Sequence, residues 1–142
     1  MLNTKDAKGS KDTKMADQDD NLEFLGRQVV DGALRVHREL GPGLLESVYE
    51  QCLAHELTKR EVSVQRQVCV PISYDGQVLD APLKLDLLVG GAVVVEIKSV
   101  ERLLPIHQAQ LLTYLRLSQR PVGFLINFNV TLIKEGIRRF VL

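Results

Sequence analysis

Residues 83–98 read LKLDLLVGGAVVVEIK and contain two strand patterns separated by a pair of glycines. Apolar side chains alternate with Lys84 and Asp86 and then continue to Val89, and a mostly β-branched run follows the glycines from Val93 to Ile97. Alternation of period two and β-branched runs predict strands, and paired glycines predict a tight turn between them. We therefore expect an antiparallel hairpin in this stretch.

The length of the glycine turn determines where Asp86 and Glu96 lie. A two-residue loop sends the two side chains to opposite faces of the hairpin, so that no shared site forms. A three-residue loop pairs Val89 with Val93 and sets Asp86 opposite Glu96, and two opposed carboxylates repel unless a cation or a proton intervenes. A third register gives Glu96 an ordinary surface ion pair with a lysine. The sequence leaves all three registers open, although glycine suits the bulge position of the three-residue loop.

The rest of the chain alternates between helical and strand patterns. Upstream, an apolar stripe of helical spacing follows Asp20, a typical N-cap, and ends at the Gly41-Pro42-Gly43 stop. A strand pattern ends at Asp75-Gly76, a strong hairpin-turn signal, and Pro105 fits the first turn of a helix. The order of these elements predicts a mixed α/β domain. We expect helices over residues 20–40, 44–59 and 105–118, and strands over residues 68–74, 83–89, 93–97, 122–128 and 137–141.

The composition is typical of one globular domain, with 142 residues, 18 basic and 18 acidic side chains and 45% hydrophobic residues. Zero net charge argues against a protein that coats nucleic acid by bulk electrostatics, but not against a local basic surface. Residues 1–20 contain one leucine and no valine, isoleucine, phenylalanine or tyrosine, and they alternate lysine with aspartate. We therefore expect a disordered tail over residues 1–20 and one domain over residues 21–142.

Cysteine content and hydropathy indicate the compartment. Cys52 and Cys69 are both embedded in apolar patterns, which is typical of buried thiols in a reducing cytosol. No segment approaches the length of a membrane span, and the N-terminus lacks the apolar stretch of a secretory signal. A cytoplasmic protein without a membrane partner is the expectation.

Three groups of polar residues remain after the core has been assigned. The first stands early in the second helix, the second on the two hairpin strands, and the third follows one face of the third helix at spacings of three and four. Each group also has an ordinary explanation, because helix starts favour acidic residues and solvated faces are polar. The groups are Glu46 with Tyr49, Asp86 with Glu96 and Lys98, and His107 with Gln110 and Tyr114.

These groups occur in an order that resembles a known family. The chain is similar to the GxxExxY family of small bacterial and archaeal proteins, which is assigned to the PD-(D/E)XK nuclease superfamily. The resemblance covers about residues 22–142 and implies a restriction-endonuclease-like core, a central mixed sheet flanked by helices. The matching residues are Gly43, Glu46 and Tyr49, then Asp86, then Glu96-Ile97-Lys98 as the ExK element, then Gln110 to Tyr114 as the QxxxY element of RecB-like nucleases.

The resemblance implies metal-assisted hydrolysis of phosphodiester bonds in DNA or RNA. It assigns Asp86, Glu96 and the carbonyl of Ile97 to a Mg²⁺ or Mn²⁺ ion, with Glu46 contributing directly or through a water. Carboxylate oxygens are the hard donors that these cations prefer. Lys98 lies two residues from Glu96 on the same strand face, where it can hold the attacking water and offset developing negative charge.

The remaining residues of the three groups receive supporting roles. Gln110 and Tyr114 are expected to orient the carboxylates or to contact substrate. Tyr49, one helical turn from Glu46, is expected to pack beneath that glutamate and fix its rotamer. His107 is either a phosphate contact or an ordinary surface histidine, and His37 receives no role.

Charge along the chain bears on substrate affinity. Residues 21–97 carry 7 basic and 11 acidic side chains, whereas residues 98–142 carry 7 basic and 2 acidic ones. The basic excess suits a nucleic-acid groove, yet solubilising charge explains it equally, so weak intrinsic affinity is expected, with a protein partner or a homodimer adding to it. The alternative function is a catalytically inactive interaction or regulatory module on a nuclease fold. A complete set of site residues favours the enzyme.

Overall fold

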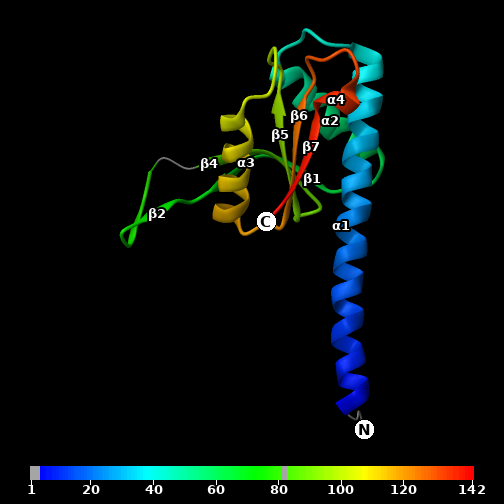
Figure 1. Cartoon of the computed structure of the whole chain (residues 1–142), viewed down its shortest axis with the longest axis vertical. Coiled ribbons are helices and arrows are strands. Elements are labelled where there is room, and N and C mark those ends of the chain that lie inside the picture. Colours follow the sequence, from blue (N-terminus) through cyan, green and yellow to red (C-terminus); the bar gives the residue numbers. More distant parts are fainter. Residues whose placement is uncertain (1–3, 81–82) are drawn as a thin grey trace.

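The structure, a computed structural model, describes residues 4–80 and 83–142 and has both helices and strands (Figure 1). The helices are α1 (Thr4–Leu40), α2 (Glu46–Lys59), α3 (Pro105–Ser118) and the short α4 (Ile133–Gly136). The strands are β1 (Val64–Val70), β2 (Ser73–Tyr74), β3 (Gln77–Val78), β4 (Leu83–Val89), β5 (Val93–Lys98), β6 (Val122–Asn127) and β7 (Ile137–Val141). The expected mixed α/β class is confirmed, and so are the helix over residues 105–118 and the two strands around the glycine turn.

Five strands form one mixed sheet in the order β1-β4-β5-β6-β7. β5 and β6 run parallel, because α3 carries the chain back along the sheet between them, and the other neighbouring pairs are antiparallel. The arrangement agrees with a restriction-endonuclease-like core. It also places the C-terminal end of β5 at the edge of the sheet where the chain leaves for α3.

The strand expected over residues 68–74 is divided in two. Proline cannot donate a hydrogen bond to a sheet ladder, and β1 ends at Val70, directly before Pro71. The chain continues into a separate hairpin of β2 and β3, which projects beside α3 (Figure 1). Its turn is Asp75-Gly76, as the sequence predicts, with φ values of 51° and 75°.

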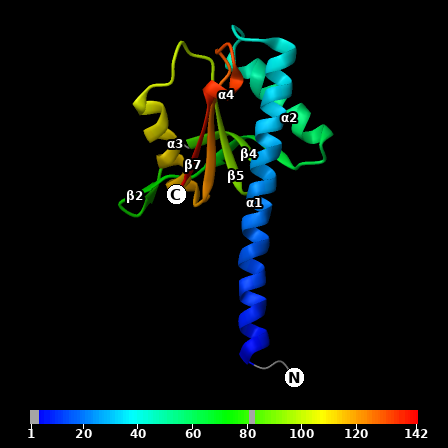
Figure 2. The same ribbon diagram turned by 45° about the vertical axis from the view of Figure 1, so that its right-hand side comes forward.

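Helices cover both faces of the sheet (Figure 2). Val93, Val95 and Ile97 of β5 pack in the core cluster beneath α1 and α2, whereas Val94 packs with Leu111 of α3. Because side chains alternate between the faces of a strand, the position of Val94 assigns Glu96 and Lys98 to the α3 side of β5. The sheet therefore separates a large apolar core from a smaller one, and the candidate residues of β5 begin where the smaller core ends.

α1 is longer than the sequence suggests. It begins at Thr4 and not at Asp20, so residues 4–20 continue the helix where the sequence predicts a disordered tail. Extending a helix that already exists costs far less than nucleating a new one, and the packed part of α1 supplies that nucleus through residues such as Val29 and Ala33. The N-terminal part projects away from the sheet (Figures 1 and 2). The helix ends at Leu40, before the predicted glycine stop.

Candidate functional site

The loop between β4 and β5 has three residues. Val89 pairs with Val93, and the next residues along each strand pair in the same register. Gly90 and Gly91 adopt φ values of 59° and 68°, and a Cβ atom at Gly90 would lie 2.7 Å from the side chain of Leu25 in α1. Backbone conformation therefore favours glycine at both positions, and at Gly90 the close approach of Leu25 adds a second reason. Of the three registers that the sequence left open, the structure has the one that brings the two carboxylates together.

Asp86 and Glu96 exchange hydrogen bonds with the backbone of the opposite strand. The N–H of Asp86 donates to Oε1 of Glu96 at 3.0 Å, and the N–H of Ile97 donates to Oδ2 of Asp86 at 2.8 Å. Glu96 is 5% exposed, and Asp86 is half-buried. The two acidic side chains are thus held side by side in one region of low solvent access.

This arrangement disfavours two negative charges. Burial raises the pKa of Glu96 to about 9, and the charge of Asp86 adds to the shift. Burial also raises the pKa of Asp86, against the opposing effect of its hydrogen bond from Ile97. Two carboxylates that share a site ionise together only when positive charge compensates them. The pair therefore requires either a proton or a bound cation.

The α3 side of the pair carries the other predicted residues. Lys98 is close enough for its charge to lower the pKa of Glu96, and its Nζ lies 3.4 Å from Oε1 of Gln110. Tyr114 follows one turn later in α3, and burial together with the charges of Glu96 and Asp86 raises its pKa. The helix α3, which connects β5 to β6, thus places the amide of Gln110 and the phenol of Tyr114 near Lys98.

Glu46 lies on the other side of the site, at the first residue of α2. Its Oε1 accepts a hydrogen bond of 3.3 Å from the N–H of Ser99, just past the end of β5. The carboxylate borders a cavity of about 190 Å³ together with Asp86 and Ile97. The other lining residues are Ser47, Glu50 and Gln67. Glu46 therefore faces the same cavity as Asp86, although its hydrogen bond goes to the backbone after β5.

The donor chemistry of this cavity suits a hard divalent cation. Its side-chain donors are carboxylate and amide oxygens, which Mg²⁺ and Mn²⁺ prefer over sulfur or imidazole. Within residues 4–80 and 83–142, no group of three or more His, Cys, Asp or Glu side chains is arranged so that it could hold a metal ion by itself. Asp86 borders the cavity, and Glu96 lies beside Asp86 but outside the lining, so few protein ligands are available. A site with few protein ligands fits Mg²⁺, because this cation retains several of its waters.

The family of the chain follows from comparison with known proteins. The family model described as the PD-(D/E)XK nuclease superfamily matches residues 23–140. The chain belongs to this superfamily. Comparison with curated proteins and comparison with solved structures each gave no significant match. The match spans every element that carries a candidate residue.

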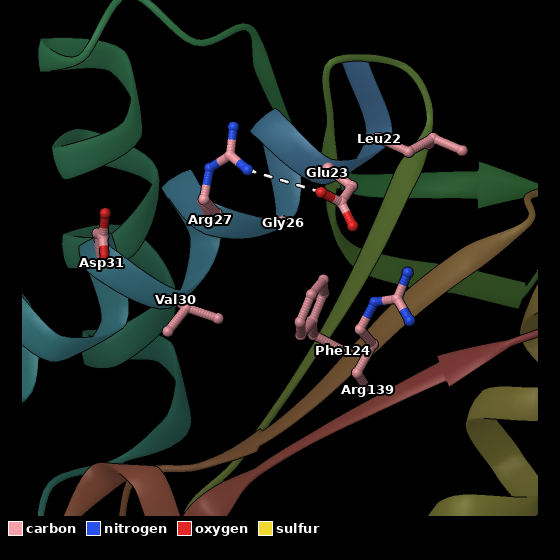
Figure 3. Close-up of a pocket in the computed structure, with 8 residues that line it drawn as sticks. All are labelled: Leu22, Glu23, Gly26, Arg27, Val30, Asp31, Phe124 and Arg139. Carbon is pink, nitrogen blue, oxygen red and sulfur yellow. Dashed lines mark ion pairs between the residues drawn. The ribbon is translucent and has the colours of Figure 1, made fainter. Parts of the chain in front are cut away.

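Membership of the PD-(D/E)XK superfamily agrees with the position of the carboxylates on adjacent strands. A larger hollow of about 360 Å³ lies elsewhere, between α1 and the edge formed by β6 and β7. Figure 3 shows the ion pair of Glu23 with Arg27 at its rim and Phe124 and Arg139 on the sheet side. None of the predicted site residues lines it. In the described part of the chain, no helix is long and apolar enough to cross a membrane.

The hydroxyl of Tyr49 binds the loop that precedes Glu46. The ring is fully buried and stacks on Phe128 at 4.5 Å. Its hydroxyl donates to the carbonyl of Gly41 at 2.6 Å and accepts from the N–H of Leu44 at 3.1 Å. The expected contact beneath Glu46 is replaced by two bonds that tie the glycine stop to α2. The tyrosine fixes where α2 begins.

Tyr49→Phe is expected to lower the free energy of unfolding by about 1–2 kcal/mol, because two part-buried backbone groups lose their hydrogen bonds to the tyrosine hydroxyl. Urea denaturation measures the change. Tyr74→Phe is the matched control, since Tyr74 is 74% exposed on the projecting hairpin and should change nothing. Equal stability of the two variants would show that the Tyr49 hydroxyl does not hold this loop.

His37 and His107 have structural contacts in this domain. Nδ1 of His107 accepts a hydrogen bond of 3.0 Å from the N–H of Leu104, so this residue caps the start of α3. Nε2 of His37 lies 2.8 Å from the carbonyl of Val130 and ties α1 to the segment after β6. The phosphate contact considered for His107 therefore competes with a capping contact that is already made.

Sequence reasoning missed three residues around the site. Glu50 is 6% exposed in α2, and Gln67 of β1 reaches both Glu50 and Asp86. Asn127 is 1% exposed and bonds through its amide to both backbone groups of Val100, which holds the chain after β5. The one available signal was the spacing of Glu50, one turn from Glu46 on the face that also carries Tyr49. A polar residue in a strand or at a strand end gives no such signal.

Proposed function

We propose that this chain is a metal-dependent nuclease that hydrolyses phosphodiester bonds of DNA or RNA with Mg²⁺ or Mn²⁺. Membership of the PD-(D/E)XK superfamily supports the nuclease class. The observation that carries the proposal is the Asp86–Glu96 pair, whose charges require compensation, with Lys98 beside it. Within the superfamily, the pattern Gly43, Glu46, Tyr49 favours the GxxExxY family.

In this proposal Asp86, Glu96 and the carbonyl of Ile97 hold the cation, and Glu46 contributes directly or through a water. When bound, the cation polarises the phosphate and lowers the pKa of a water. Glu46 suits a contribution through water, since its carboxylate borders the cavity and is already bonded to Ser99. The four groups come from α2, β4 and β5.

Lys98 acts on the reacting groups. Its ammonium group holds the attacking water and balances the charge that develops on the phosphate oxygens. Gln110 fixes the direction of the ammonium through the contact at 3.4 Å. Tyr114 stands beside the carboxylates, where its hydroxyl orients them or contacts the substrate.

Weak intrinsic affinity for nucleic acid accompanies this chemistry. Acidic side chains outnumber basic ones by 11 to 7 in residues 21–97, basic ones outnumber acidic ones by 7 to 2 in residues 98–142, and the whole chain has no net charge. A protein partner or a second copy of the chain would add affinity. Both cysteines are free thiols, which suits the reducing cytoplasm proposed for the chain. The expected burial is wrong for Cys69, which is exposed, and Cys52 is half-buried.

The second candidate function is an interaction module that keeps the fold without catalysis. Metal binding and cleavage discriminate the two. Thermal melting with added Mn²⁺ should raise the Tm of the wild type on the order of 8 °C at about a hundredfold excess over the Kd, because a ligand of the native state stabilises it. Asp86→Asn should lose this shift and stay folded in the absence of metal, since the amide is isosteric and its oxygen still accepts from Ile97.

Asp31→Asn is the matched control, because Asp31 is an exposed aspartate of α1 outside the cavity. It should keep the full Mn²⁺ shift. A wild type whose Tm does not respond to Mn²⁺ or Mg²⁺ would contradict the proposed metal centre and favour the inactive module.

A further inference from the structure

The ladder between β1 and β4 is interrupted beside the site. Arg66 pairs with Leu87 and Val68 pairs with Leu85, but the residues between them, Gln67 and Asp86, form no ladder pair. Gln67 has a φ of 51°, in the left-handed region that side chains other than glycine rarely adopt. The irregularity coincides with one of the two candidate carboxylates.

Both strands change face at this interruption. In β1, Val64 packs with the core beneath α1 and α2, whereas Val68 packs with the core beneath α3. In β4, Leu85 belongs to the α3 core and Leu87 to the other, and Leu88 returns to the α3 core. Because the strands change face at this point, Asp86 borders the cavity beside α2 and does not join the α3 core.

The positive φ of Gln67 is not explained by a turn of the chain. The other non-glycine residues with positive φ in the described ranges lie at chain reversals: Glu61 after α2, Asp75 in the β2–β3 turn and Gln119 at the end of α3. Gln67 lies within a strand. A strained conformation persists only where surrounding contacts impose it, and such residues cluster at functional sites.

The contacts of the Gln67 side chain supply that constraint. Its Nε2 donates to Oε1 of Glu50 and lies 3.4 Å from Oδ1 of Asp86. Glu50 is held in turn by Nη2 of Arg66, at 2.8 Å from its Oε2. Asp86 therefore has one oxygen directed by the N–H of Ile97 and the other directed by the Gln67 amide.

We propose that Gln67 is a positioning residue for the candidate metal site, aimed by its left-handed backbone and anchored by the buried Glu50. The inference rests on the proposed function, because it concerns how Asp86 is presented to a divalent cation. An amide suits this place better than a carboxylate or an ammonium group. Its N–H donors hold two acidic side chains apart without adding charge to the cavity. Groups that orient metal ligands typically change metal affinity about 10- to 100-fold when they are removed.

Gln67→Gly separates positioning from folding. Glycine adopts positive φ freely, so the variant loses the side-chain contacts while its backbone strain is relieved. We expect Mn²⁺ affinity, measured on the full chain by titration calorimetry and by the EPR signal of free Mn²⁺, to fall about tenfold. Urea denaturation without metal should show stability close to that of the wild type.

Two further variants complete the test. Gln119→Gly relieves the same kind of backbone strain at the end of α3 and should leave Mn²⁺ affinity unchanged. Gln67→Asn keeps an amide and tolerates the left-handed backbone, and it should restore part of the lost affinity. Mn²⁺ affinity equal in the wild type and Gln67→Gly would overturn this inference alone. A loss without any rescue by asparagine would also overturn it, and a wild type that binds no Mn²⁺ would overturn the proposed function itself.

Discussion

Lys98→Ala is expected to reduce the rate of nucleic-acid cleavage on the order of a thousandfold, with the fold retained. The ammonium group is the single cation placed against the Asp86–Glu96 pair in the described contacts, and removal of one preorganised charge-stabilising group typically has an effect of this size. Lys98 is half-buried and outside both apolar cores, so its truncation opens no core cavity. Cleavage of plasmid DNA and of single-stranded RNA with Mn²⁺ measures the effect.

Lys84→Ala is the matched control for this experiment. Lys84 is also on a strand of the same sheet, but it is exposed and pairs with Cys69 away from the cavity. Its removal should leave cleavage unchanged. If Lys98→Ala cleaves as fast as the wild type, the cleavage comes from a contaminating nuclease or from another site, and the role of Lys98 is wrong.

The metal-free protein is expected to lose stability steadily as the pH rises from about 4.5 to about 9. The pKa of Glu96 is about 9 in the folded chain and 4.5 for the free side chain. Between these values the unfolded chain has released a proton that the folded chain retains, so each pH unit lowers the free energy of unfolding by about 1.4 kcal/mol. The raised pKa of Asp86 acts in the same direction. Urea denaturation with a chelator, at intervals of one pH unit, measures the slope.

Glu96→Gln should flatten this pH dependence, because the amide is neutral at every pH, whereas Glu23→Gln on the exposed rim of α1 should not change it. Saturating Mg²⁺ should also reduce the slope in the wild type, since a bound cation takes the place of the proton. Stability that stays constant from pH 5 to pH 9 without metal would contradict a protonated, buried Glu96.

Local signals account for the parts of the fold that were predicted. Pro105 marks the start of α3, and Asp75-Gly76 forms the predicted turn, because the conformations of these residues are restricted within a few positions of chain. The register of the Gly90-Gly91 turn could not be derived in this way. Paired glycines accept loops of two or three residues, and the choice depends on distant contacts, including the close approach of Leu25 and the hydrogen bond from Gly90 to Ser63. The length of α1 likewise depends on propagation from its packed half.

The residues of the candidate site also fall into those that local sequence signals indicate and those that depend on tertiary packing. Asp86, Glu96 and Lys98 can be proposed from the sequence because their spacing is local to one hairpin and matches a known motif. Glu50 and Gln67 look like ordinary polar residues of a helix and a strand, since burial and backbone strain arise only when α2 packs beside β1. The sequence predicts that Tyr49 packs beneath Glu46, but it gives no sign of the hydroxyl contacts to Gly41 and Leu44, because the loop that carries them folds back over the helix start.

The interruption at Gln67 also bears on how the sheet meets other chains. β1 is an edge strand of the five-stranded sheet. The unpaired N–H and C=O groups of an unbroken edge strand can pair with a strand of another chain. A left-handed residue in the middle of β1 and Pro71 directly after it leave no long regular edge to pair with. The opposite edge, β7, carries Arg138 and Arg139, charges of the kind that discourage such pairing. The same kink that directs an amide toward Asp86 thus protects the protein from adding strands to itself and aggregating.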